Sequence, residues 1–92
     1  MAKVKKKVDN KEINWGETVR ELVLTIAEKD CGIPRTKHGA RVAGERILAE
    51  MTENKLQTVQ HWIDSPNHNR PRGATGVLLK TIAKQYKSKV IY

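Results

Sequence analysis

The amino-acid sequence predicts a small, mainly all-α domain. Apolar residues recur at intervals of three and four in four segments, the spacing that places them on one face of a helix. Glycine and proline interrupt the chain between those segments. At 92 residues the chain is long enough for one domain with a modest core. We therefore expect a basic N-terminal arm over residues 1–14 and a four-helix domain over residues 15–92.

The first helix is expected over residues 17–29. Asn14 and Glu17 have the spacing of a capping box, in which the first side chain accepts a hydrogen bond from the backbone of the second residue. Gly32 and Pro34 then stop the helix. The apolar residues between these signals fall at helical spacing and are Val19, Leu22, Val23, Ile26 and Ala27.

Three further helices are expected, over residues 37–53, 56–64 and 76–87. Thr36 and Thr75 are the expected caps of the first and last of these. Gly44, among small residues, would let the helix over residues 37–53 pack closely against a neighbour. The segment from 65 to 73 is rich in proline, asparagine and glycine and is expected to be irregular.

Side chains on the apolar faces of these helices are the expected core. In the helix over residues 37–53, Arg41, Glu45 and Arg46 are expected on the polar side. In the last helix, Val77 and Leu78 are expected on the buried side. The residues predicted to be buried are Leu22, Ile26, Ala43, Ile47, Val59, Trp62, Leu78 and Ile82.

The two ends of the chain have another pattern. The arm is rich in lysine, with only Val4 and Val8 to bury. Its alternation suits a strand, and a disordered arm that contacts phosphates is the equal alternative. Residues 90–92 also have strand propensity and could pair with residues 3–8. The N-terminal arm and the C-terminal tail are thus expected to be either β-like or flexible.

Positive charge dominates the chain, because 18 Lys and Arg against 10 Asp and Glu give a formal net charge of +8. Six basic residues and no acidic one lie between Ser65 and the C-terminus. Such a balance favours a polyanionic partner, either nucleic acid or an anionic membrane surface. No apolar run approaches the ~20 residues of a membrane span, and the single Cys31 allows no intramolecular disulfide. We expect a cytoplasmic, nucleoid-associated protein with no membrane partner.

Enzymatic constellations are missing from the sequence. The three histidines and one cysteine have no metal-ligand spacing. Residues 72–76 lack the Lys-Ser/Thr pair of a phosphate-binding loop. Ser65 lies near His61 and Asp64 but precedes Pro66, the pattern of a helix stop rather than of a nucleophile. We expect no catalysis, no cofactor, no metal and no small-molecule substrate.

Residues 45–86 resemble the lambda-repressor-like and Cro-like helix-turn-helix regulators. Ala49, Val59 and the pair Trp62-Ile63 carry the resemblance, followed by the sequence RPRG and a Leu-Leu-x-x-Ile-Ala helix. In that family a small residue faces the crossing of two helices, and an aliphatic residue ten positions later holds the recognition helix. The turn departs from the family pattern, because Glu53 stands where glycine is usual and Asn54 where an aliphatic residue is usual. The resemblance implies a sequence-specific, double-stranded DNA-binding transcriptional regulator of phage or mobile-element type.

The helix over residues 56–64 is the expected recognition helix. Gln57, Gln60 and His61 lie at i, i+3 and i+4, so they share one face. Glutamine can pair with adenine, and histidine or lysine with the acceptors of guanine, in the major groove. The residues expected to read bases are Lys55, Gln57, Thr58, Gln60 and His61. The residues expected to contact phosphates are Lys5, Lys6, Lys7, Arg70, Arg72, Lys80 and Lys84.

Two other functions fit the same basic surface. One is a small phage-type protein that inhibits a host protein or nucleoprotein machine through an acidic surface of that partner. The other is RNA binding, although four aromatic side chains are few for a stacking platform. Regulators of the helix-turn-helix class are often homodimers on two half-sites, and residues 90–92 are the candidate dimer contact.

Overall fold

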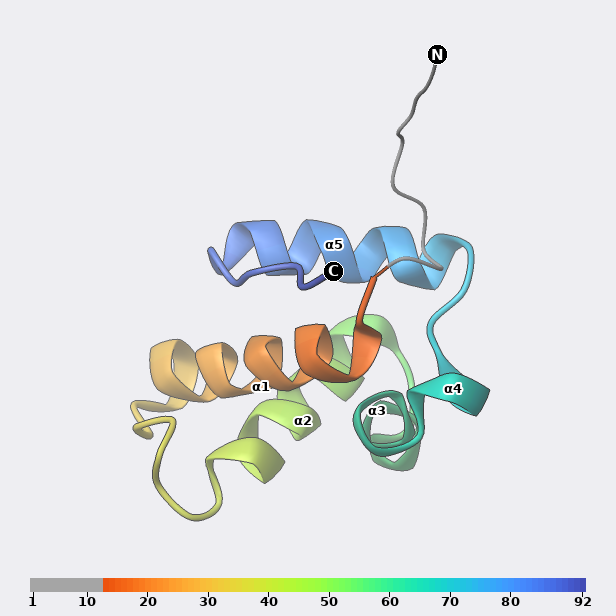
Figure 1. Ribbon diagram of the computed structural model, residues 1–92. Helices are drawn as coiled ribbons and strands as arrows, with labels where there is room; N and C mark the ends of the chain where they lie inside the picture. Colours follow the sequence, from red (N-terminus) through yellow and green to blue (C-terminus); the bar gives the residue numbers. More distant parts are fainter. Residues whose placement is uncertain (1–12) are drawn as a thin grey trace.

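The described part of the protein, residues 13–92 of a computed structural model, is a mainly helical domain, as the sequence predicts. Its elements are α1 (Trp15–Cys31), α2 (Ala40–Thr52), α3 (Leu56–Asp64), α4 (Pro66–Asn69) and α5 (Ala74–Gln85). In Figure 1, α1 and α5 run across the view, and α3 is seen end-on below α1, next to α4. No strand occurs in this part of the chain. Residues 1–12, and with them most of the predicted arm, lie outside the described residues.

The predicted capping signals set both ends of α1. The Asn14 side chain accepts a hydrogen bond from the backbone N–H of Glu17 at 3.1 Å, which confirms the cap. At the other end Gly32 adopts a left-handed conformation, with φ of 67°, and its N–H donates to the carbonyl of Ala27. The helix is therefore two residues longer at each end than the predicted range of 17–29.

The predicted start of α2 is wrong. Lys37 donates its backbone N–H to Pro34 at 2.8 Å, and Ala40 donates to Lys37 at 3.1 Å, so residues 34–40 form consecutive turns. Gly39, with φ of 95°, is the N-cap residue in place of Thr36. Glycine at positive φ ends the turn and prevents the helix from extending backwards.

Helix α3 has the predicted bounds, but the segment after it does not stay irregular. Pro66 begins the single-turn helix α4, at a position where the missing N–H of proline costs no hydrogen bond. Helix α5 then starts at Ala74, two residues earlier than expected, and ends at Gln85. Gly73 is its N-cap residue, so Thr75 lies inside the helix and the predicted threonine cap is wrong.

One core joins α1, α2, α3 and α5, and most of the predicted core is confirmed. The confirmed buried residues are Leu22, Ile26, Val59, Trp62 and Ile82. Ala43 and Ile47 are only partly buried. The predicted burial of Leu78 is wrong, because 38% of this residue is exposed. Val77 is 57% exposed, whereas Leu79 is 1% exposed and fills the core. The face of α5 that packs inward carries Gly76, Leu79, Ile82 and Ala83, so Leu79 takes the place of Leu78 in the core while Ile82 is buried as predicted.

Close packing of α1 and α2 depends on Gly44. A Cβ atom at this position would lie 1.8 Å from the backbone oxygen of Val23 in α1. No side chain fits in that space, because real Cβ contacts are never this short. The expected close approach at Gly44 is confirmed, and it brings α2 directly against the backbone of α1.

The C-terminal tail packs along the start of α1. Ile91 donates its backbone N–H to the Thr18 hydroxyl at 2.9 Å, and its carbonyl accepts from the N–H of Asn14 at 2.7 Å. These bonds occupy the backbone of Ile91 within the chain, and no strand forms in residues 90–92. The predicted pairing of the tail with residues 3–8 lies outside the described residues.

Candidate nucleic-acid interface

Helix α3 has one deeply buried face and one open face. Val59, Trp62 and Ile63 are buried against the core. Gln57 and His61, four residues apart, are exposed on the opposite side. The buried face fixes the rotation of the helix, so the open face presents a constant set of polar groups. Of the other residues expected to read bases, Lys55 is exposed at the N-cap and Thr58 is partly buried.

The turn between α2 and α3 is tight and left-handed. Glu53 has φ of 56° and ψ of 42°, a conformation that favours glycine. Asn54 donates its backbone N–H to the carbonyl of Ala49 at 2.9 Å and its side-chain amide to the carbonyl of Thr52 at 3.0 Å. The two departures of the sequence from the helix-turn-helix pattern therefore fall at a glutamate in a glycine-like conformation and at an asparagine that caps the end of α2.

Gln60 lies three residues after Gln57 on α3 but is less exposed than Gln57 and His61. It is partly buried, and its Nε2 atom donates to Oε1 of Glu45 in α2 at 3.3 Å. Glu45 was expected on the polar side of its helix, and that prediction is wrong, since only 1% of the residue is exposed. A signal for this burial is present in the sequence, because Arg41 lies four residues before Glu45 and can neutralise it on the same helix.

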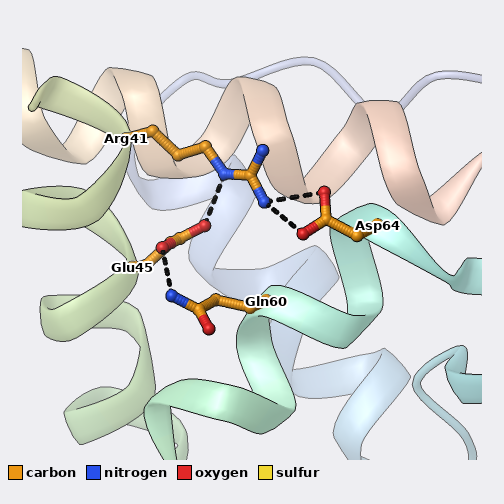
Figure 2. Close-up of polar contacts among 4 residues, drawn as sticks. All are labelled: Arg41, Glu45, Gln60 and Asp64. Carbon is orange, nitrogen blue, oxygen red and sulfur yellow. Dashed lines mark hydrogen bonds and ion pairs between the residues drawn. The ribbon is translucent and has the colours of Figure 1, made fainter. Parts of the chain in front are cut away.

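Arg41 completes a polar cluster between α2 and α3, formed by Arg41, Glu45, Gln60 and Asp64 (Figure 2). Its Nε donates to Oε2 of Glu45 at 2.6 Å, and its Nη2 donates to both carboxylate oxygens of Asp64 at 2.8 and 2.9 Å. Burial lowers the pKa of Arg41, but the hydrogen bonds to the two carboxylates outweigh it and raise the pKa above its ordinary value. The cluster thus ties the first turn of α2 to the last turn of α3.

The loop after α4 carries two arginines, Arg70 and Arg72. Pro71 is fully buried between them and anchors the loop. Arg72 is exposed, whereas Arg70 is partly buried and lines an open groove of about 350 Å³ with Asn67 and Tyr92. On α5, Lys80 is partly buried and Lys84 is exposed. The predicted phosphate contacts at Lys5, Lys6 and Lys7 lie outside the described residues.

Neither a metal-binding cluster nor a membrane-spanning helix occurs between residues 13 and 92. Between residues 13 and 92, the His, Cys, Asp and Glu side chains form no group of three that could hold a metal ion. None of the described helices combines the length and apolar character needed to cross a membrane. No protein-family model, curated protein or solved structure matches this chain.

Proposed function

We propose that this protein binds double-stranded DNA sequence-specifically, with α3 in the major groove, and that it regulates transcription. One observation carries the proposal. Helix α3 is held by Val59, Trp62 and Ile63 on its buried side and leaves Gln57 and His61 open on the other. The major groove admits a single α-helix, and its base edges carry the donor and acceptor patterns that such side chains recognise.

The open side chains of α3 have the chemistry for base readout. Gln57 can pair with adenine through both atoms of its amide, and His61 can donate to the acceptors of guanine. Lys55 lies at the N-terminal end of α3, the end from which recognition helices usually contact bases. A good bidentate pairing contributes ~1–3 kcal/mol of discrimination against the wrong base.

The basic residues that follow α3 suit contacts with the DNA backbone. Arg72 and Lys84 are exposed, and no acidic residue follows Asp64 in the sequence. Contacts of this kind release counterions, so log K falls with log salt by about 0.9 for each phosphate contacted. They add affinity and orient the protein, while the base contacts of α3 supply specificity.

The turn before α3 also supports the proposal. In helix-turn-helix regulators this position is usually glycine, and Glu53 adopts the left-handed backbone conformation that glycine favours. The left-handed conformation of this turn is thus compatible with the two-helix unit, α2 and α3, that we propose from the resemblance over residues 45–86.

A binding experiment with three nucleic acids tests the proposal. The protein is titrated against its own upstream region, a random duplex and an RNA hairpin, at about 50 and 200 mM salt. We expect binding to both duplexes that weakens with salt and is tighter for one sequence, which selection from a random duplex pool then defines. Absence of salt-dependent binding to nucleic acid would overturn the proposal and favour an acidic protein partner. Binding to the RNA hairpin alone would favour RNA recognition.

A further inference from the structure

Glu45 is a buried carboxylate that accepts hydrogen bonds from Arg41 in its own helix and from Gln60 in α3. Its Oε2 accepts from Arg41 at 2.6 Å, and its Oε1 accepts from the amide of Gln60 at 3.3 Å. With 1% of the residue exposed, Glu45 has no surface for a direct contact with DNA. Any effect that it has on recognition must therefore act through Gln60 or through the position of α3.

The chemistry of a carboxylate fixes which way the Gln60 amide faces. A carboxylate paired with a guanidinium accepts hydrogen bonds and donates none. The amide nitrogen of Gln60 must therefore face Glu45, because the opposite orientation would bring two oxygen atoms together. In Figure 2 the carbonyl oxygen of Gln60 accordingly points away from Glu45.

The remaining groups of the Gln60 amide form an adenine-reading pair. An amide has two N–H donors and one carbonyl acceptor. One N–H is used by Glu45, which leaves one donor and one acceptor. Adenine presents the complementary pair in the major groove, the N7 acceptor and the N6 amino donor.

Resting on the proposed function, we propose that Glu45 is a positioning residue that orients Gln60 to read adenine at one position of the DNA site. The ion pair between Arg41 and Asp64 supports this role, because it holds the last turn of α3 against the first turn of α2. Specificity at that base pair then depends on a residue that touches no DNA. Gln57, on the open face, makes no side-chain hydrogen bond within residues 13–92 and reads its own base independently of Glu45.

The substitution Glu45→Gln gives this proposal a directional test. Arg41 only donates, so the oxygen of the new amide stays on Arg41 and its nitrogen turns toward Gln60. Gln60 must then present its carbonyl inward and its NH₂ group outward. Two donors match the N7 and O6 acceptors of guanine. We expect the preferred base at this position to change from adenine to guanine, with a reversal of about tenfold or more in relative affinity.

The experiment is selection from a random duplex pool, run first on the wild-type protein and then on Glu45→Gln. A matched control is Glu50→Gln, which makes the same change of charge at an exposed position of α2 and should leave the preference unchanged. An unchanged adenine preference in Glu45→Gln, with a normal far-UV circular dichroism spectrum, overturns the role of Glu45. Failure of the wild type to select any sequence overturns the proposed function itself, so the two failures are distinct.

A second measurement applies if Glu45→Gln does not fold. In the wild-type protein, NMR hydrogen exchange compares the side-chain amide protons of Gln60 with those of exposed Gln57. We expect one proton of Gln60 to exchange about tenfold or more slowly, because it is bonded to buried Glu45. Equal exchange at the two glutamines would overturn the inference without any variant.

Discussion

The close approach of α1 and α2 makes Gly44→Ala a severe test of the fold. The new Cβ would lie 1.8 Å from the backbone oxygen of Val23 and 2.5 Å from its carbonyl carbon, whereas ordinary contact begins near 3.4 Å. The obstacle is backbone rather than the end of a flexible side chain, so a change of rotamer cannot relieve it. The two helices would have to separate by about 1.6 Å, the difference between 3.4 and 1.8 Å.

The expected loss in the free energy of unfolding follows from the gap that this separation opens between α1 and α2. A gap of 0.5–1 Å already removes roughly a quarter to a half of the dispersion energy of the contacts across it. Overpacking ordinarily costs about 1–3 kcal/mol, and a rigid obstacle places this variant at or above the upper end. Alanine regains about 1 kcal/mol of helix propensity over glycine. We expect a net loss of about 2–4 kcal/mol in the free energy of unfolding.

Urea denaturation followed by far-UV circular dichroism measures this loss. With a slope of roughly 1–3 kcal/mol per M for a small domain, the midpoint should fall by about 0.7–4 M. Arg46→Ala, at an exposed position of the same helix, is the control and should stay within about 0.5 kcal/mol of the wild type. A Gly44→Ala protein that is more stable by about 1 kcal/mol would show that propensity alone governs the site and would refute the helix crossing.

Three further predictions concern the turn, the end of α5 and the interface. Glu53→Gly should raise the unfolding free energy by about 0.5–1 kcal/mol, since glycine adopts φ of 56° without strain; a loss of stability in urea would contradict this. The hydrogen bond from Tyr86 to Asp30, at 2.6 Å, with burial and the Asp30 charge, raises the pKa of Tyr86 to about 12. Because the pKa is raised in the folded state, the contribution of this hydrogen bond to the free energy of unfolding is complete below the unfolded pKa of about 10 and is lost as the pH rises to about 12. A phenolate absorbance titration checks this, and Asp30→Asn should lower the midpoint. Gln57→Ala should reduce sequence discrimination about 5-fold or more with little effect on random DNA, whereas Arg72→Ala should weaken binding to all duplexes and reduce the salt slope by about 1. Equal losses on all sequences for Gln57→Ala would mean that α3 does not read bases.

The sequence predicts the bounds and the buried face of α3 because its apolar residues are compatible with only one buried face. Val59, Trp62 and Ile63 define a single narrow face between clear breaks, and the observed helix has the predicted bounds. In α5 the consecutive residues Val77, Leu78 and Leu79 are compatible with two rotations of the helix. Packing in the shared core selects the one that buries Leu79, which a local pattern cannot determine.

The predicted N-cap residues of α2 and α5 are wrong, and in both cases a glycine lies close to the predicted threonine. Thr36 and Thr75 both have the side chain of an N-cap residue, but Gly39 and Gly73 take that place. A positive φ at glycine changes the direction of the chain, and this conformation depends on the packing of the helices that follow. The helix of four residues, α4, was missed for a related reason, because Pro66 can begin a helix as well as end one.

The polar cluster shows why the candidate site was predicted only in part. Periodicity places Glu45 among the charged residues of α2. Its environment depends on α3, because Gln60 in α3 donates to Glu45 and Asp64 in α3 binds Arg41. Sequence spacing alone groups Gln60 with Gln57 and His61, yet the contact with Glu45 gives Gln60 a different environment. A polar residue can face the solvent by helical periodicity and still be held by a neighbouring element. Tertiary contacts therefore determine which of the polar side chains of α3 act alone.

The two ends of the α2–α3 unit are fixed by different means, and this bears on how it would bind. At one end, Glu53 and Asn54 form a short turn whose backbone bonds return to Ala49 and Glu50. At the other end, Arg41 holds Asp64 with two hydrogen bonds. A helix held at both ends and buried along one face has little freedom to rotate when it meets a partner. Binding through α3 would thus require little ordering of the backbone, and the free energy of its contacts would appear mainly as affinity and specificity.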